Sequence, residues 1–370
     1  MEIFDASVYN YVYILAVAVI TFLYWPEYLS RKTNGSVTCH EKNDNSYVLL
    51  VAMILFVGTR PVNGISFVDM GGYAETLNMF AGRHFEFRWD TDNKIFDNLI
   101  LWYGCNSYDH TLFFVILATI YFGAMYWGLQ RLFPDSTKLA FITYLAGFST
   151  FSYAVNGMKA GMAASIFILA LSFRDKKWIC ILLMLVSLGF HHSMVMPIAA
   201  AILAYFIKKP KYCYAIWGFC LLMCIFHITY FQGFFAGMSD DQGARYLTAT
   251  QETTNAYIGF RPDFILYSAV PVIMGYYFEL KGPYHLSRKY NFLIHFYIFT
   301  NAIWMLCMYA SFNNRIAYLS WFVYPIVIIA PFLDKQNRSP LRYMQLGKAV
   351  RYHLYFTSFM TIVYYGLLGL

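Results

Sequence analysis

The sequence predicts an all-α integral membrane protein, and two features of its composition point to that fold class. Hydrophobic residues make up 59% of the 370 residues and charged residues only 13%, whereas about 25% of a soluble domain is charged. The hydrophobic residues also gather in runs close to the roughly 20 residues that a helix needs to cross a bilayer. We therefore expect a single polytopic domain, residues 1–370, with about 12 transmembrane helices.

The apolar runs place these helices at 8–24, 47–62, 111–129, 139–155, 157–173, 177–191, 193–207, 212–231, 263–279, 291–310, 316–333 and 352–369. Two longer connections remain, 60–110 and 232–262. A connection this long is usually functional or carries helices of its own. Within the first, the part from Lys94 to Tyr103 is amphipathic, which is typical of a helix on the membrane surface.

Positive charge indicates the orientation of the helices. Most of the 27 Lys and Arg residues fall in one set of short connections, as is typical of cytoplasmic loops. Both termini and the connections 60–110 and 232–262 are then outside. The net charge of +7 is spread over these loops, so we expect no nucleic-acid partner. The acidic start of the chain lacks the basic segment of a cleavable signal peptide.

The stretch 156–193 organises the predicted site. Its two apolar runs enclose the basic turn 174–177, which predicts that both far ends lie at the outer face. The run 178–207 lies between two basic turns and predicts a hairpin with arms of about 14 residues, which rise only about 21 Å. Because a bilayer core is about 30 Å thick, we expect an outer-face recess. Its polar residues are Asn156, Lys159, His191, His192 and Ser193.

Cationic side chains at the outer face are candidates for binding a phosphate or pyrophosphate. Arg offers paired donors to phosphate oxygens, and Lys offers a point charge. The alternative is that some of these side chains extend to lipid headgroups. We favour binding for Lys159 and Arg315, which lie at helix ends against the charge bias. The full set is Arg60, Lys159, Arg245, Arg261 and Arg315.

Three residues are candidates for the general base. A neutral imidazole of His191 or His192 can accept a proton from a sugar hydroxyl, and so can the carboxylate of Asp69. The histidines could instead hold the hairpin tip by hydrogen bonds, and Asp69 could be an ordinary turn residue beside Gly71. We find no ligand spacing typical of a metal site and no nucleotide-binding loop, and we expect no cofactor.

Four short motifs follow one another in the chain. An acid and a tyrosine, Asp69 and Tyr73, follow the second predicted helix. Asn156-Gly-Met-Lys159 opens a helix, and Phe190-His191-His192-Ser193 ends the next. The last motif is Asn314-Arg315 with Tyr318.

In their order and spacing, over about residues 45–330, these motifs resemble the EpsG family of bacterial exopolysaccharide proteins, which are Wzy-like repeat-unit polymerases. That family commonly has Arg-Gln where this chain has Lys159-Ala160, so the charge is kept while the paired donors of Arg are lost. The resemblance implies a GT-C-like glycosyltransferase bundle in the bacterial cytoplasmic membrane, with its active site facing outward.

The implied reaction joins polyprenyl-pyrophosphate-linked oligosaccharide repeat units into exopolysaccharide, capsule or O-antigen. The implied partners are the lipid-linked donor and acceptor, the bilayer, and flippase and chain-length regulator proteins. The alternative is a transporter or flippase of the same lipid-linked units, but the chain lacks the internal repeat typical of that class. A membrane acyltransferase that uses the histidine pair would need an acidic motif nearby, which is lacking.

On this interpretation the sequence predicts two groups of site residues. Lys159, Arg60 and Arg315 would stabilise the charge on the leaving pyrophosphate. His191 or Asp69 would take the proton of the acceptor hydroxyl, with His192 as the third catalytic candidate. The predicted substrate-binding residues are Arg60, Tyr73, Asn156, Lys159, Ser193, Arg245, Asn314 and Arg315.

Overall fold

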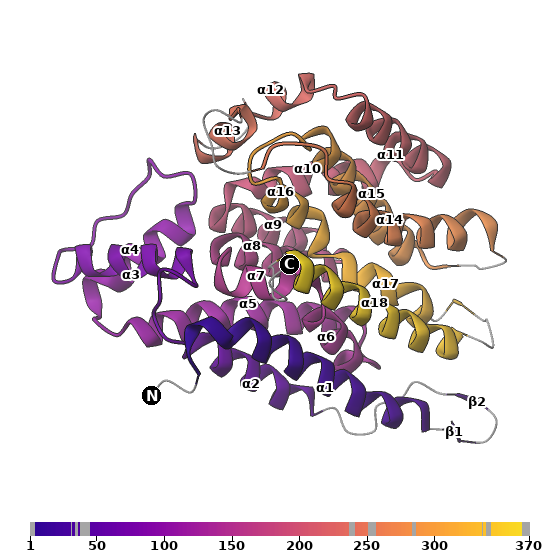
Figure 1. Ribbon diagram of the computed structural model, residues 1–370, viewed down its shortest axis with the longest axis horizontal. Coiled ribbons are helices and arrows are strands. Elements are labelled where there is room, and N and C mark those ends of the chain that lie inside the picture. Colours follow the sequence, from indigo (N-terminus) through magenta and orange to yellow (C-terminus); the bar gives the residue numbers. More distant parts are fainter. Residues whose placement is uncertain are drawn as a thin grey trace. The chain divides into compact units, whose positions relative to one another are not determined.

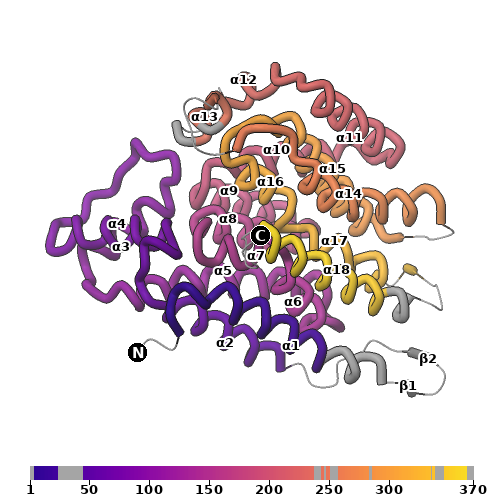
Figure 2. The backbone as a smooth tube through the Cα atoms, viewed as in Figure 1, coloured from indigo at the N-terminus to yellow at the C-terminus, as the bar shows by residue number. Residues whose placement is uncertain are grey.

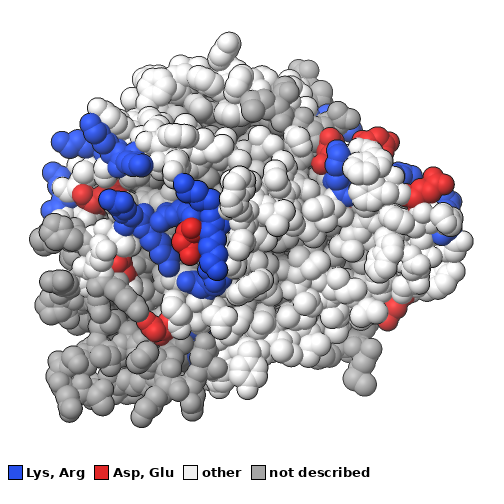
Figure 3. Space-filling view, turned by 180° about the vertical axis from the view of Figure 1, so that it is seen from behind, with Lys and Arg blue, Asp and Glu red and all other residues white. Residues whose placement is uncertain are grey.

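The computed structural model describes residues 4–30, 32–33, 36–37, 45–236, 241–250, 257–282, 286–334, 336–337 and 342–364. Regular structure in these residues is helical except for one antiparallel pair of two-residue strands, β1 (Lys32–Thr33) and β2 (Ser36–Val37) (Figure 1). Most of the molecular face seen in Figure 3 carries neither Lys and Arg nor Asp and Glu. The predicted helical class is therefore confirmed.

The chain divides into two compact units. The first comprises Met1–His191 and Arg351–Leu370, and the second comprises His192–Val350. The helices of the first unit are η1 (Ala6–Val8), α1 (Tyr9–Ser30), α2 (Ser46–Gly58), α3 (Val68–Phe80), α4 (Lys94–Asn106), α5 (His110–Leu132), α6 (Thr137–Leu145), α7 (Phe148–Val155), α8 (Met158–Ser172) and α9 (Lys177–Phe190).

Helix α8 forms the core of the first unit and packs against α5, α7 and α9. Every residue from Gly161 to Leu171 is buried. Small residues allow this close packing: a Cβ atom at Gly161 would lie 2.7 Å from the carbonyl oxygen of Tyr153. The Ser187 hydroxyl of α9 donates to the carbonyl oxygen of Ala163 at 2.7 Å, which ties α9 to α8. The small residues of α8 therefore serve helix packing.

The second unit is built around α15. Its helices are η2 (His192–Met194), α10 (Val195–Phe206), α11 (Pro210–Ile225), α12 (Tyr230–Ala236), α13 (Asp241–Thr248), α14 (Pro262–Tyr276), the π-helix η3 (Tyr277–Lys281), α15 (Arg288–Leu306), α16 (Asn313–Trp321) and α17 (Tyr324–Leu333). Helix α18 (Arg342–Tyr364) begins in this unit and ends in the first. All residues of α15 from Leu293 to Ala302 are buried, because α10, α11, α14, α16 and α17 pack around it.

Among the described residues, all twelve predicted segments fall on helices, and three of them contain breaks. Residues 365–369 of the last segment lie outside the described residues. Segment 139–155 breaks at Ala146 and Gly147, where Gly147 has the extended backbone of an N-cap. Segment 212–231 bends by 107° between α11 and α12. The third break separates α16 from α17, which has a proline in its first turn. The sequence missed α3 and α13, and it found α4 as the amphipathic part of the first long connection.

Helix length tests the membrane prediction among the described residues. Three stretches are long and apolar enough to span a membrane: Ala6–Leu23, His110–Leu132 and Asn313–Leu333. The bent pair α11 and α12 makes a fourth if it is one span. Four more apolar helices are shorter, α2, α8, α9 and the stretch His192–Phe206. These helices indicate a multi-pass membrane protein, and the number of about 12 crossings stays a prediction.

Candidate functional site

Lysine and aspartate side chains meet where α4 packs near the start of α8. The Nζ atom of Lys159 lies 3.8 Å from Oδ1 of Asp97, and the two side chains are 23% and 28% exposed. Lys159 belongs to the first turn of α8, where backbone N–H groups lack helical partners and the helix dipole is positive. An anion is therefore favoured here, and solvent reaches both members of the pair.

The buried ring of Phe96 connects this pair to α3. The Nζ atom of Lys159 lies 5.7 Å from the centroid of the Phe96 ring, and the Tyr73 ring centroid lies 5.1 Å from it. Asp69 and Tyr73 are both half-buried residues of α3. Their spacing of four residues puts them on one face of the helix. The structure thus brings Tyr73 of α3 and Lys159 of α8 to the same ring, that of Phe96.

Asn156 lies between α7 and α8, at the C-terminal cap of α7. Its Nδ2 donates to the carbonyl oxygen of Ser66 at 3.4 Å, which ties it to the segment before α3. Its Oδ1 is buried and has no hydrogen-bond partner among the described residues. A buried acceptor without a partner costs about 1–3 kcal/mol, so Asn156 offers an unused acceptor two residues before α8 begins.

Burial sets the proton affinity of Asp97. It raises the pKa of the carboxyl, while the ammonium of Lys159 and a hydrogen bond with Asn93 lower it, and burial has the larger effect. The carboxylate is therefore a stronger base than an ordinary aspartate. Asp97 lies on α4, which belongs to the connection 60–110 between membrane segments.

Arg60, predicted to bind pyrophosphate, is enclosed instead. Its side chain is 3% exposed. The guanidinium donates to the carbonyl oxygens of Val57 and Val155, near the last turns of α2 and α7. A cation is favoured at a helix C-terminus, which explains how this charge is buried.

Two aromatic rings and a thioether complete the enclosure of Arg60. Its guanidinium carbon lies 5.1 Å from the centroid of the Phe67 ring and 5.6 Å from that of the Phe114 ring, within the range of cation–π attraction. Its Nη2 atom lies 3.2 Å from Sδ of Met158. These contacts leave little of the guanidinium open to a ligand and join α2, α3, α5 and α8.

His191 is the last residue of the first unit's longer segment, Met1–His191. It is the C-terminal cap of α9, is half-buried, and donates its backbone N–H to the carbonyl oxygen of Ser187 at 3.1 Å. Helix α9 packs against α4, where Ile95 fills the space beside Gly189. His191 therefore follows the part of α9 that α4 contacts. His192 and Ser193 belong to η2 of the second unit and are also half-buried.

The other predicted cations lie in the second unit. Arg245 is exposed on α13, and Arg315 is exposed in the first turn of α16. An apolar cluster that includes Leu247 and Ala310, with Ile316 packed against it, joins these two helices. Asn314, also in the first turn of α16, is half-buried. The role of Arg245, Asn314 and Arg315 in substrate binding stays a prediction.

Phe96 and Asp97 are site residues that the sequence did not predict. One signal was present: the amphipathic stretch from Lys94 carries an acid in its first turn. A lysine at a membrane-embedded helix end also calls for a nearby carboxylate. Among the described residues, no group of three or more His, Cys, Asp or Glu side chains is arranged to hold a metal.

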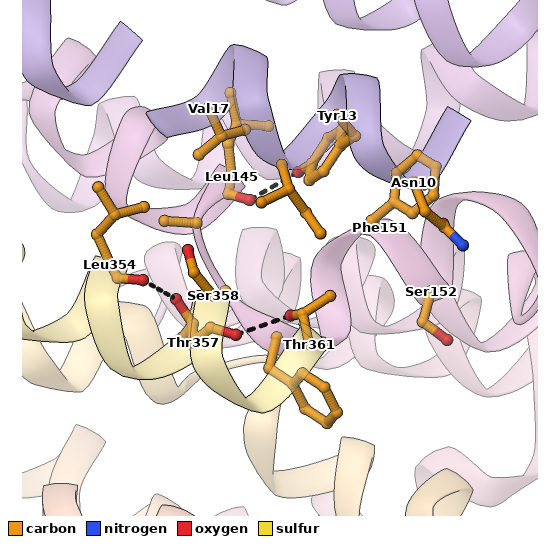
Figure 4. A pocket seen from close by; sticks show the side chains of 14 residues that line it. Asn10, Tyr13, Val17, Leu145, Phe151, Ser152, Leu354, Thr357, Ser358 and Thr361 are labelled. Carbon is orange, nitrogen blue, oxygen red and sulfur yellow. Dashed lines mark hydrogen bonds between the residues drawn. The ribbon is translucent and has the colours of Figure 1, made fainter. Parts of the chain in front are cut away.

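A small cavity of about 30 Å³ lies elsewhere in the first unit, between α1, the α6–α7 turn and α18 (Figure 4). Its volume is enough for one or two water molecules. The Tyr13 hydroxyl donates to the carbonyl oxygen of Leu145 at 2.6 Å, and the Thr361 hydroxyl donates to that of Thr357 at 2.7 Å. None of the predicted site residues lines this cavity.

Comparison with known proteins identifies the family. Neither the curated proteins nor the solved structures include a match. Residues 45–366 match the EpsG family, a range that includes every predicted site residue and both members of the Lys159–Asp97 pair. Membership indicates a membrane protein of exopolysaccharide biosynthesis. The chain belongs to the EpsG family.

Proposed function

We propose that this protein is a membrane glycosyltransferase that joins polyprenyl-pyrophosphate-linked oligosaccharide repeat units at the outer face of the cytoplasmic membrane. The observation that carries the proposal is the solvent-accessible Lys159–Asp97 pair at the start of α8. Beside it the chain has an unused acceptor on Asn156. This combination of one cation, one carboxylate and a helix N-terminus suits a diphosphate leaving group and a hydroxyl acceptor.

In the proposed reaction, the oxygen of an acceptor hydroxyl attacks the anomeric carbon of the donor sugar. The bond between that carbon and the diphosphate oxygen breaks, and the diphosphate leaves with the electron pair. Lys159 and the first-turn N–H groups of α8 stabilise the charge that develops on it. A base accepts the proton of the attacking hydroxyl.

Asp97 joins Asp69 and His191 as a candidate for this base. Its pKa is already raised by burial. Lys159 lowers that pKa, so a diphosphate that draws Lys159 away weakens this effect and makes Asp97 a stronger base. Donor binding would thus prepare the base for the acceptor. Tyr73 and Asn156 would orient sugar hydroxyls through their own polar groups.

The remaining predictions complete the proposal. The chain would cross the membrane about 12 times as one polytopic domain, with residues 60–110 and 232–262 outside. Flippase and chain-length regulator proteins would supply the units and limit the polymer. His192 stays the third candidate for the base, and the lipid-linked substrates would be contacted by Ser193, Arg245, Asn314 and Arg315.

The test is glycan chain length in cells whose own gene is replaced by Lys159→Ala, His191→Ala or Arg315→Ala, with the amount of protein in the membrane checked. Lys211→Ala is the control, since this exposed lysine lies in the first turn of α11, outside the proposed site. We expect Lys159→Ala to abolish polymer while single lipid-linked units accumulate at the outer face. Accumulation at the inner face would favour a flippase, and normal polymer in all three variants would contradict the proposed site.

A further inference from the structure

The loop between α3 and α4 borders a second hollow of the first unit. The hollow encloses about 570 Å³. The residues that line it are Phe80, Leu101 and Cys105 of the two helices, here called the floor, and residues 84–90 of the loop, here called the rim. Figure 2 shows this loop with α3 and α4. None of the residues predicted to bind or react with the substrate lines the hollow.

The rim combines aromatic and charged side chains. Residues 84–90 read His-Phe-Glu-Phe-Arg-Trp-Asp, and all of them line the hollow. The rings of Phe87 and Trp89 lie 4.6 Å apart, centroid to centroid, and Trp89 is 76% exposed. Glu86, Arg88 and Asp90 add hydrogen-bond acceptors and donors. Exposed aromatic rings beside polar groups can stack on a ligand and hydrogen-bond to it at once.

Asn98 of α4 holds the loop in place. Its Nδ2 donates to the carbonyl oxygen of Arg88 at 2.9 Å and its Oδ1 accepts from the backbone N–H of Arg88 at 2.7 Å. The same Nδ2 donates to the carbonyl oxygen of Lys94 at 2.7 Å. Gly82, with φ of +71°, provides the left-handed turn that starts the loop. The rim is therefore ordered before any ligand arrives, which lowers the entropy cost of binding.

We propose that this hollow binds sugar residues of the glycan that the enzyme extends. A sugar ring presents C–H faces, which stack on aromatic rings, and hydroxyls, which both donate and accept. An acyl chain would instead need a lining without charged groups, whereas Glu86, Arg88 and Asp90 line this hollow. A phosphate would need a positive one, whereas the rim carries two carboxylates and one arginine. The choice of a glycan rests on the proposed function.

Helix α4 connects the hollow to the Lys159–Asp97 pair. Phe96 and Asp97 contact Lys159, while Leu101 and Cys105 of the same helix form part of the floor of the hollow. Four and eight residues along a helix correspond to roughly 6 and 12 Å. One oligosaccharide can span that distance. The hollow would hold sugars behind the reacting end of the chain.

The test measures glycan binding by purified full-length protein in lipid nanodiscs. The probe is the mixture of oligosaccharides released by partial hydrolysis of the exopolysaccharide that the source cells make, and calorimetry gives its Kd. We expect Trp89→Ala and Glu86→Gln each to weaken binding at least about tenfold, since each removes a sugar contact. Trp102→Ala is the matched control: this tryptophan of α4 is 50% exposed and does not line the hollow.

Three outcomes would overturn the inference: wild-type protein that binds no fragment, Trp89→Ala protein that binds as wild type does, or equal loss in Trp102→Ala protein. The last result would mean that the aromatic residues only place α4 at the membrane surface. Lys159→Ala protein separates this inference from the proposed function. It should bind fragments normally and form no polymer. If it polymerises, the proposed catalytic site fails while the glycan hollow stands.

Discussion

Lys159 and Arg60 lie close to the same turn of the chain, but their surroundings differ. Arg60 donates to the carbonyl oxygen of Val155 before the turn and contacts Met158 after it, and it is 3% exposed. Lys159 follows the turn, and its side chain is 23% exposed. It lies beside the carboxylate of Asp97, whose side chain is 28% exposed. The sequence predicted pyrophosphate binding for both cations, but their burial indicates different roles. Arg60 joins helices, and Lys159 remains accessible to a ligand.

Substitution of Lys159 tests the accessible side of this comparison and carries the largest expected effect. Loss of one charged group that stabilises a leaving group costs on the order of 100-fold or more in rate. We expect Lys159→Ala to lower turnover of purified protein on lipid-linked units by at least about that factor. Lys159→Arg should recover most of it, because the charge returns and a paired donor is added. Equal loss in both variants would point to a packing defect.

Substitution of Arg60 tests the enclosed side. Arg60→Ala leaves the carbonyl oxygens of Val57 and Val155 without this donor and opens a cavity between Phe67 and Phe114. We expect the free energy of unfolding to fall by on the order of 2–4 kcal/mol, seen as lower thermal stability in detergent. The fraction that stays folded should still bind the lipid-linked donor. A folded Arg60→Ala protein that has lost only donor binding would contradict the structural role of Arg60.

The dependence on pH sharpens the role of Asp97. The ionised carboxylate accepts a proton, so activity falls as pH drops through its pKa. Burial raises that pKa, which places the acid limb of the rate profile above the ordinary value of about 3.9. Asp97→Asn should lower turnover by about 100-fold and remove that limb. A rate profile that Asp97→Asn leaves unchanged in shape would assign the base to Asp69 or His191.

The smallest expected effect concerns Asn156. Its Oδ1 makes no hydrogen bond among the described residues, so Asn156→Ala loses only the 3.4 Å contact with Ser66 within the protein. We expect stability to change by less than about 1 kcal/mol. If Oδ1 accepts from a substrate hydroxyl, KM for the lipid-linked unit should rise about fivefold. A large loss of stability with unchanged KM would identify Asn156 as a structural residue.

The sequence predicted the helices better than the environments of their charges. The segments that hydrophobic runs predicted fall on helices in the described residues, because burial and membrane contact both require apolar residues. The breaks inside three of them depend on local turns such as Ala146–Gly147. Lys159 and Asn156 stood out because polar groups at helix ends are conspicuous in an apolar chain.

Contacts between distant segments were not predictable in the same way. In the sequence, nothing distinguishes Arg60 from the other predicted cations. In the structure, the rings of Phe67 and Phe114 enclose it. The pairing of Asp97 with Lys159 joins residues 62 positions apart in the chain, through a connection whose helices α3 and α4 pack together. Composition and motif order do not report such packing. The site therefore acquired Phe96 and Asp97 only from the structure.

The most direct test that Lys159, and not Arg60, binds the diphosphate is the affinity of the purified protein, in lipid nanodiscs, for polyprenyl pyrophosphate. Wild type, Lys159→Ala and Arg60→Lys are compared, since the last keeps the charge but loses the paired donors. We expect Lys159→Ala to bind at least about tenfold more weakly and Arg60→Lys to bind as wild type does. Unchanged affinity in Lys159→Ala, together with loss in a folded Arg60→Lys protein, would contradict this expectation.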